Sequence, residues 1–366
     1  MNCKQSKEMT EFLKELVDVN NGKVLIPATN PSPGHWFGGG NMVWHDGAVY
    51  LCGRYRDYGD SRSGLTAGIR GRECAVFRSQ DGGETFEKVQ SWSKSDLSTS
   101  ENEVLSIEGT ALHQLSDGSW EMFISTEKKL NYPEGYEAFQ KPGTGVWSID
   151  RITGETPEKM NVNSLEPMLW NAERPEYLHV KDPTVWDLPD GSTAMAFCTH
   201  PFTWASGGSG LAVRGSEGEP FHVRNWEFTH RGPAWDVGVC RITGTFSLAE
   251  VSGYEGQDAK RIFFYDGAEC MRSHEEHKAG DKRPRGYCCE ELGGAFAAED
   301  NEQTDLRRLS SCQPLFVSPY ATGCCRYVDA LVLPDGILAT WQQAQPDGSQ
   351  PLVGHKIRHP DSQQGK

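Results

Sequence analysis

A short hairpin phrase recurs along this chain of 366 residues. An apolar strand runs into an Asp-Gly turn, and a second apolar strand rich in aromatic residues follows. The four regular copies are Asn41–Cys52, Gly109–Ile124, Pro183–Phe197 and Val328–Trp341, and a fifth, stretched version lies between Ala234 and Asp266. Five hairpins at intervals of tens of residues are typical of a radial β array. The sequence therefore predicts an all-β fold, a five-bladed β-propeller of four-stranded blades.

The blades can be placed along the chain from this repeat. Blade one is predicted strand by strand at Asn41–His45, Ala48–Arg54, Cys74–Arg78 and Thr85–Val89. The later blades are predicted at about 109–170, 182–230, 235–317 and 324–358. The last blade lacks a fourth strand, so we expect the N-terminal strand at 24–28 to complete it and close the ring. A single propeller domain at 24–358 would then carry an extension at 1–23, with a short amphipathic helix at Thr10–Val17, and a tail at 359–366.

Composition and charge limit the partners of the chain. A formal net charge of -15 argues against nucleic acid, which requires a basic surface. The mean hydropathy is -0.59, and no apolar run approaches the ~18 residues of a membrane span. The first residues, 1–8, lack the apolar core of a secretory signal, so we expect a cytoplasmic protein. The 11 cysteines show neither a disulfide spacing nor a Cys-x-x-Cys pair, which predicts reduced thiols and no metal or cofactor.

Three carboxylates stand at matching places near the start of the innermost strands. Glu108 precedes its turn residue Asp117 by nine positions, Asp182 precedes Asp190 by eight, and Asp236 opens blade four. Equivalent positions in consecutive blades would bring all three to one axial pocket. Like charges held close raise one another's pKa, which suits a general acid beside a general base. The alternative, that each carboxylate caps a turn or pairs with a neighbouring Arg, stays open.

Long loops between the second and third strands are expected to surround this pocket. The first of them, 53–72, holds five Arg in an otherwise acidic protein. Guanidinium groups bind carboxylate or sulfate through two hydrogen bonds, so an anionic sugar is one interpretation and neutralisation of the acidic mouth is the other. Aromatic rings pack on sugars, and a His can move a proton. The predicted substrate-binding residues are His35, Trp36, Arg54, Arg56, Asp57, His200, Trp204 and Tyr327.

Two sets of motifs resemble known propellers. The segment Ser79–Phe86 resembles the Asp box of sialidases, with Phe86 in place of Trp, and such a turn is structural. The phrases Ile107–Thr110 and Lys181–Pro183 resemble the Glu-Gly-Pro-like and Arg-Asp-Pro-like motifs of five-bladed propeller glycoside hydrolases, which include arabinanases, β-xylosidases, invertases and anhydrogalactosidases. In those families two Asp and one Glu act from different blades. This chain departs from the pattern in blade one, where Gly34–Asn41 contains no Asp.

The resemblance implies a glycoside hydrolase that acts through paired carboxylates. Glu108 would be the acid, Asp236 the base or nucleophile, and Asp182 a pKa modulator, although Asp182 and Asp236 could exchange roles. Either His35 or His200 could replace the carboxylate missing from blade one. We expect an exo-acting enzyme for a short, anionic oligosaccharide, and a homo-oligomer remains open.

Three other functions remain as alternatives. A sialidase-like hydrolase would need six blades, and a polysaccharide lyase would use His and Tyr. A non-catalytic carbohydrate-binding propeller would not bring the carboxylates together. The segment His274–His277 lacks the His-Glu-x-x-His spacing of a metal motif and is predicted to be a solvated loop.

Overall fold

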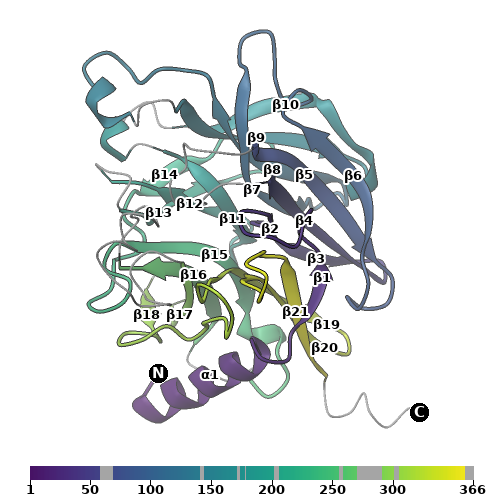
Figure 1. Ribbon diagram of the computed structural model, residues 1–366, viewed down its shortest axis with the longest axis vertical. Helices are drawn as coiled ribbons and strands as arrows, with labels where there is room; N and C mark the ends of the chain where they lie inside the picture. The colour runs from purple at the N-terminus through teal and green to yellow at the C-terminus, as the bar shows by residue number, and fades with distance from the viewer. Residues whose placement is uncertain are drawn as a thin grey trace.

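The computed structural model describes residues 1–57, 69–140, 144–170, 174–177, 179–201, 206–254, 259–269, 291–300 and 305–358. These residues form five antiparallel sheets arranged around a centre, with β7, β11 and β15 innermost and β10, β14 and β18 at the outside (Figure 1). The predicted fold class, an all-β propeller of five blades, is confirmed. Five blades also count against the sialidase-like alternative, which requires six.

Each blade is a meander that starts at the centre and runs outward. Blade one contains β2 (Trp36–Gly38) and β3 (Met42–His45), which both pair with β4 (Ala48–Asp57), followed by β5 (Ile69–Ser79) and β6 (Glu87–Ser93). Blade two contains β7 (Val104–Gln114), β8 (Trp120–Lys128), β9 (Val146–Gly154) and β10 (Met160–Trp170). Blade three contains β11 (Lys181–Asp187), β12 (Thr193–Thr199), β13 (Gly208–Arg214) and β14 (His222–Asn225). Blade four contains β15 (Val239–Ser247), β16 (Arg261–Ala268), β17 (Leu292–Ala298) and β18 (Leu306–Arg308).

The fifth blade joins the two ends of the ring. It contains β19 (Cys325–Leu333), β20 (Gly336–Gln343) and β21 (Leu352–Arg358), and β1 (Lys23–Ile26) pairs antiparallel with β21. The N-terminal strand therefore supplies the fourth strand, as predicted. The helix α1 (Cys3–Leu16) starts earlier than the predicted Thr10, because Asn2 and Gln5 form a capping box before the apolar stripe begins. The buried Met9, Leu13 and Leu16 pack it onto blades four and five.

Layers of large apolar side chains hold neighbouring blades together. Tyr50 of blade one lies 5.7 Å from the ring of Trp120 in blade two, and Trp186 of blade three lies 5.0 Å from Phe263 in blade four. These rings belong to continuous clusters of buried residues between the sheets. Sheets packed in this way fix the innermost strands relative to one another. Side chains from different blades can therefore be held at one point on the axis.

The turn between β5 and β6 is organised by one carboxylate. Asp81 accepts hydrogen bonds from the backbone amides of Glu84 and Thr85, each at 3.0 Å, and Gly83 N–H donates to Ser79 Oγ at 2.8 Å. The pKa of Asp81 falls to about 2, because these hydrogen bonds outweigh the effect of burial. Asp81 thus has a structural part in the turn, and the likeness to a sialidase Asp box stays a prediction.

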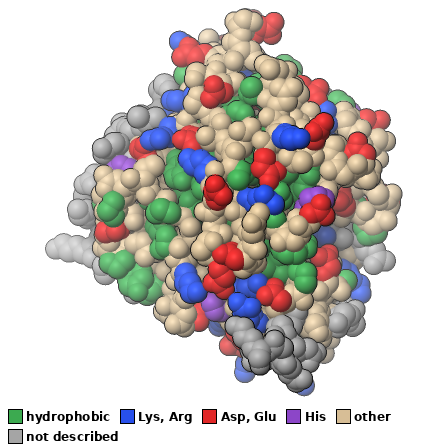
Figure 2. All heavy atoms as spheres, turned by 90° about the vertical axis from the view of Figure 1, so that its right-hand side faces the viewer, with side chains coloured by type: hydrophobic (Ala, Val, Ile, Leu, Met, Phe, Trp, Pro, Cys, Tyr) green, Lys and Arg blue, Asp and Glu red, His purple; other side chains and the backbone are tan. Residues whose placement is uncertain are grey.

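The surface is mixed in charge over the side drawn in Figure 2. Acidic and basic side chains alternate there, with hydrophobic side chains in small groups between them. The negative net charge is therefore not concentrated in one patch on this side. Within the described ranges, no helix has both the length and the apolar character needed to cross a membrane.

Candidate active site

The pairing of three innermost strands becomes irregular at the same level of the propeller. In β7, β11 and β19 two residues stand opposite one residue of the neighbouring strand, and Glu108, Asp182 and Tyr327 are the first residues of these bulges. A β-bulge redirects a side chain and is common beside active sites. Asp182 and Tyr327 also have positive φ angles of 52° and 51°, a strained backbone for residues other than Gly. Three blades thus depart from regular strand geometry at one height.

Glu108 is held as an ionised carboxylate. It accepts hydrogen bonds from Arg54 Nη2 at 3.1 Å and from Ser106 Oγ at 2.8 Å, and its side chain is 16% exposed. Burial opposes the charge, but Arg54, Lys181 and the bond from Ser106 outweigh burial and lower the pKa of Glu108 to about 2. A group with this pKa is a poor proton donor near neutral pH. The environment of Glu108 therefore favours a base or nucleophile over the predicted acid.

Blade one supplies the guanidinium that binds Glu108, from Arg54 on β4. Arg54 crosses the backbone at Gly39, which has a φ of 76°, and a Cβ at this position would lie 2.1 Å from Arg54 Nη1. Arg54 also donates to Tyr327 Oη at 3.1 Å and lies 4.6 Å from the centre of the Trp36 ring. The absence of a side chain at Gly39 therefore makes room for the cation that pairs with Glu108.

One carboxylate oxygen of Asp182 is held by a hydrogen bond, and the other faces two cationic side chains. Its Oδ1 accepts from the Gly109 amide at 2.7 Å, and a Cβ on Gly109 would come equally close to Oδ1. Its Oδ2 lies 3.9 Å from Arg241 Nη1 and 4.0 Å from Lys181 Nζ, and has no hydrogen-bond partner among the described residues. The residue that follows Glu108 thus orients the second predicted carboxylate.

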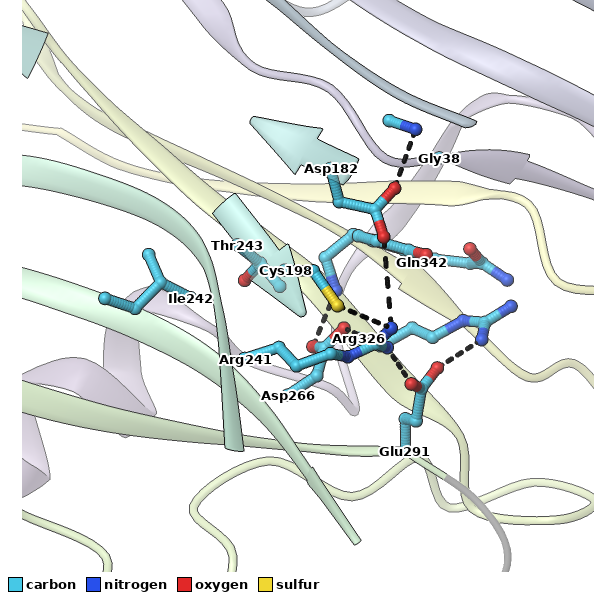
Figure 3. Close-up of polar contacts among 12 residues, drawn as sticks. Gly38, Asp182, Cys198, Arg241, Ile242, Thr243, Asp266, Glu291, Arg326 and Gln342 are labelled. Atoms are coloured by element: carbon cyan, nitrogen blue, oxygen red, sulfur yellow. Dashed lines mark hydrogen bonds and ion pairs between the residues drawn. The ribbon is translucent and has the colours of Figure 1, made fainter. Parts of the chain in front are cut away.

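Blade four contributes Asp266 and Arg241, which pair across β16 and β15 (Figure 3). Asp266 is fully buried, accepts from the Tyr327 amide at 3.0 Å and lies 3.8 Å from Arg241 Nη2. Burial raises the pKa of Asp266 to about 6, although Arg241 and Arg326 favour its ionised form. A carboxyl group with a raised pKa thus lies near Asp182, whose charge contributes to the rise.

Glu291 completes this group of charges. It forms ion pairs with both Arg241 and Arg326, and Figure 3 shows it between them. We call Arg54, Glu108, Asp182, Arg241, Asp266, Glu291, Arg326 and Tyr327 the axial cluster. The residues Arg241, Asp266, Glu291 and Arg326 were missed from the sequence. The signal that could have found Arg241 and Arg326 is a charge inside an otherwise apolar innermost strand.

The structure does not bring Asp236 to the axial cluster. Asp236 precedes the first residue of β15, Val239, and its buried carboxylate accepts from Tyr265 Oη at 2.8 Å and pairs with Arg308 on the outer strand β18. Burial raises its pKa against the effect of Arg308. The predicted convergence of three carboxylates is wrong for Asp236, and Asp266 lies at the axial cluster instead. The prediction for Asp236 rests only on its place at the start of blade four, because that blade has no Asp-Gly turn from which to count.

This pairing predicts a structural phenotype for Asp236. In Asp236→Asn the charge of Arg308 would stay largely buried without its counterion, which we expect to lower the free energy of unfolding by about 3 kcal/mol. Urea denaturation measures the change, with Asp117→Asn in an exposed turn as the control. A variant with wild-type stability and lost turnover would instead return Asp236 to the catalytic group.

Four of the predicted substrate-binding residues lie at the axis or beside it. Arg54 and Tyr327 belong to the axial cluster, and Trp36 contacts the cluster through Arg54 and through Arg326, whose guanidinium is 5.1 Å from its ring. Arg56 is buried among Arg54, Arg326 and Arg70, and burial together with these charges lowers its pKa to about 10 despite the opposing effect of Glu108. Trp36 is only 4% exposed, so it supports guanidinium groups and does not offer an open face to a sugar.

The remaining predicted residues are tied into their own loops or lie outside the description. Asp57 is bound by Thr29 and by Arg72, the latter at 2.5 Å. His35 and His200 are buried, with contacts from their Nδ1 atoms to Ser32 Oγ and to the carbonyl of Ser206, respectively. Trp204 and the segment 274–277 lie outside the described residues. Within the part of the chain that is described, no group of three His, Cys, Asp or Glu side chains could hold a metal ion.

A small pocket beside Asp182, which we call the axial neck, has a volume of about 10 Å³. It is lined by Gly39, Gly40, Gly109, Thr110 and Asp182, among others. A space of this size holds one water molecule and no sugar. Beyond it a cavity of about 340 Å³ extends to the ends of the innermost strands, between His113, Asp187 and Arg261. The axial cluster and this lower cavity are thus separated by the neck.

Comparison with known proteins places the fold. No protein family and no curated protein matches the sequence. Among solved structures, the endo-arabinase from Bacteroides thetaiotaomicron superposes with a TM-score of 0.55, at 10% identity over 93% of this chain and 99% of that one. The exo-1,5-α-L-arabinanase from a bovine ruminal metagenomic library gives 0.53, at 11% identity over 93% and 98%. RS223-β-xylosidase gives 0.52, at 10% identity over 93% and 97%.

These similarities establish the fold. The chain has the five-bladed propeller architecture of these glycoside hydrolases along nearly its whole length. At this level of identity the comparison concerns the architecture, and the chemistry has to be argued from the axial cluster.

Proposed function

We propose that the protein is a glycoside hydrolase whose reaction takes place at the axial cluster. The observation that carries the proposal is a group of carboxyl groups from neighbouring blades near the propeller axis, in which Glu108 is connected to Asp266 through Arg54 and Tyr327, and Asp182 and Asp266 both face Arg241. Glu108 has a pKa of about 2 and Asp266 a pKa of about 6. Environments that push two such pKa values apart define a base and an acid. Cleavage of a glycosidic bond requires both.

Glu108 serves in this proposal as the base or nucleophile. Its ionised form is available throughout the working pH range, and Arg54 and Ser106 fix its orientation. Asp182 serves as the group that donates the proton. It borders the axial neck, whereas Asp266 is fully buried. Both lie within 4 Å of Arg241, and the charge of Asp182 contributes to the raised pKa of Asp266.

The shape of the channel supports an exo-acting enzyme. A sugar that reaches Asp182 cannot pass through a neck that holds one water molecule. A polysaccharide chain bound at Asp182 would therefore end at the cluster.

The positive charges near Glu108 support a substrate that carries a carboxylate or sulfate. Arg326, Arg54 and Arg70 lie close enough to Arg56 to lower its pKa, together with burial, to about 10. An anionic group bound beside Arg56 would relieve this repulsion and could accept two hydrogen bonds from the guanidinium.

The Arg56→Ala variant tests the choice of substrate. We expect kcat/KM for a uronate-bearing glycoside to fall about 100-fold, because a desolvated charge-assisted contact contributes about 1.5–3 kcal/mol. The neutral glycoside with the same linkage should change by less than about threefold. Arg72→Ala, at an Arg that pairs with Asp57, is the matched control. An equal loss on both substrates would show that Arg56 maintains the site and does not select the charge.

Turnover of a glycoside panel tests the function itself. Purified protein is incubated from pH 4 to pH 8 with neutral and uronate-bearing aryl glycosides and short oligosaccharides, and the release of aglycone and of reducing sugar is followed. Release of single sugar units from chain ends is the expected result. Sugar binding in calorimetry without cleavage of any bound compound would favour the non-catalytic carbohydrate-binding propeller.

A further inference from the structure

We propose that the lower cavity binds a small sugar acid, whose carboxylate is held by Arg261. This cavity of about 340 Å³ lies on the far side of the axial neck from the axial cluster, and Pro183 and Thr184 line both the neck and the cavity. Cavities that take small molecules measure about 300–1,000 Å³. The lower cavity would be a second binding site, and the inference does not depend on the reaction proposed for the axial cluster.

All five blades contribute to the wall of the lower cavity. The wall contains residues of the innermost strands β3, β7, β11, β15 and β19, together with Arg261, the first residue of β16. Among the lining residues, Asp187 and Glu250 are exposed, and Gln114 and Ser247 are half-buried. The cavity is therefore accessible from solvent, and a ligand in it would contact side chains from several blades at once.

Arg261 is a cation of this wall that lacks an anionic partner. No carboxylate of the described residues lies within 4 Å of its guanidinium. Its one hydrogen bond within the described ranges runs from Nη1 to Thr245 Oγ1 and is long, at 3.4 Å, while Nε is buried without a partner. Burial lowers the pKa of Arg261 to about 10, although Glu250 and Asp187 act in the opposite direction from a distance. Buried polar groups are nearly always satisfied, so this guanidinium is prepared for an anion from outside the chain.

The other cation of the cavity, His113, already has its anions. Its Nδ1 lies 2.8 Å from Glu121 Oε1, and its Nε2 lies 3.1 Å from Asp187 Oδ1. Burial disfavours the imidazolium, but these two contacts outweigh burial and raise the pKa of His113 to about 9. His113 and its two carboxylates therefore satisfy one another at neutral pH. Arg261 is left as the cation that a ligand can engage.

The remaining polar groups of the wall fit the hydroxyl groups of a sugar. Glu250 and Asp187 can accept hydrogen bonds from hydroxyl groups, and the hydroxyls of Thr184 and Ser247 can donate or accept. Ser247 stands directly opposite Arg261 in the pairing of β15 with β16. A multiply charged anion such as phosphate would bring more negative charge beside the two carboxylates than one guanidinium offsets. A single carboxylate on a ring of hydroxyl groups matches one cation surrounded by acceptors.

Titration calorimetry of the full chain with D-glucuronate and D-glucose tests the inference, because the two sugars differ by one carboxylate. We expect glucuronate to bind at least about tenfold more tightly than glucose. Arg261→Gln should weaken the binding of glucuronate about 10- to 100-fold, which is the usual contribution of a charge-assisted hydrogen bond. Arg78→Gln, at an Arg that pairs with Glu158 outside the cavity, is the matched control and should bind like the wild type. Equal affinity for both sugars, or no binding of glucuronate, overturns the inference.

A further variant separates this site from the axial cluster. If glucuronate binds in the lower cavity, its affinity stays at the wild-type level in Arg56→Ala, and this supports the inference even if no glycoside is cleaved. Two bound equivalents, of which each variant loses one, would establish a site at each end of the axis. An affinity that falls in Arg56→Ala and is unchanged in Arg261→Gln would place the ligand at the axial cluster. That result would support the proposed function and overturn this inference.

The stability of Arg261→Gln provides a measurement without ligand. The variant removes a largely desolvated cation that has no counterion, so its midpoint of urea unfolding should equal or exceed that of the wild type. Arg214→Gln, at a buried Arg that pairs with Glu121, should unfold at a lower urea concentration. A comparable decrease in Arg261→Gln would show that Arg261 supports the blade and is not reserved for a ligand, and the inference would be wrong.

Discussion

Replacement of Glu108 by glutamine is expected to reduce kcat about 1,000-fold. The amide has nearly the same shape; its oxygen can still accept from Arg54 and its NH2 can donate to Ser106 Oγ, but it can neither take up a proton nor attack a carbon atom. Positioned acid–base groups contribute about 10²- to 10⁴-fold to a reaction rate, which sets the magnitude. Steady-state kinetics on the best glycoside of the panel measures kcat, and calorimetry measures binding, which should change by less than about fivefold.

The control for Glu108→Gln lies in the same blade. Glu127 on β8 accepts from the amide of Gly145 and pairs with Arg70, so Glu127→Gln removes a buried carboxylate without touching the axial contacts. We expect this control to lose less than tenfold in kcat. Similar losses in both variants would mean that the mouth of the propeller needs its ion pairs for folding, and would remove Glu108 from the reaction.

The second large effect is expected for Asp182→Asn. If Asp182 delivers the proton, the variant should lose about 100- to 1,000-fold in kcat/KM on glycosides with poor leaving groups. An aryl glycoside with an acidic phenol needs little protonation to depart and should lose less than about tenfold. The ratio between the two substrates measures the donor role, because a distorted site would slow both equally. Equal losses would therefore assign Asp182 to binding.

The same assignment of acid and base predicts the direction in which the activity of the wild type changes with pH. The proposed reaction requires a protonated carboxyl group in the axial cluster, and the pKa of Asp266 is raised to about 6. Activity is thus complete below about pH 5 and declines as the pH rises through 6. Glu108, with a pKa of about 2, is ionised across this range and adds no acid limb. A profile that rises between pH 5 and pH 6 would show that the group with the raised pKa works as the base, and the two roles would be exchanged.

Much of the fold could be predicted because the sequence patterns that specify it each span only a few residues. The Asp-Gly phrase specifies a hairpin within about ten residues, and β3–β4, β7–β8, β11–β12 and β19–β20 all form where it occurs. The N-terminal strand β1 pairs with β21, which follows from a last blade that lacks one strand. The start of α1 was placed too late, because its first turns are polar and depend on the capping box at Asn2.

The candidate site was predictable only in part. Glu108 and Asp182 stand at fixed distances from their turns, and both occur in bulges at the same level of their strands. Asp236 has no such turn to count from, and its carboxylate belongs to a separate pair with Arg308. The role proposed for Glu108 differs from the predicted acid, since its pKa depends on Arg54, a residue of another blade. No local sequence pattern predicts the contact between Arg54 and Glu108.

The sequence by itself thus determined the repeat, the closure of the ring and two of the axial carboxylates, because turn chemistry and strand periodicity act between residues close together in the chain. The tertiary structure alone decided that Asp266, Arg241, Glu291 and Arg326 join them, and which carboxyl group keeps a proton. Those properties arise from burial and from charges on different blades that packing brings within a few ångströms. Coulomb interactions at such distances depend on spatial separation and on the exclusion of solvent, and a short stretch of sequence specifies neither of them.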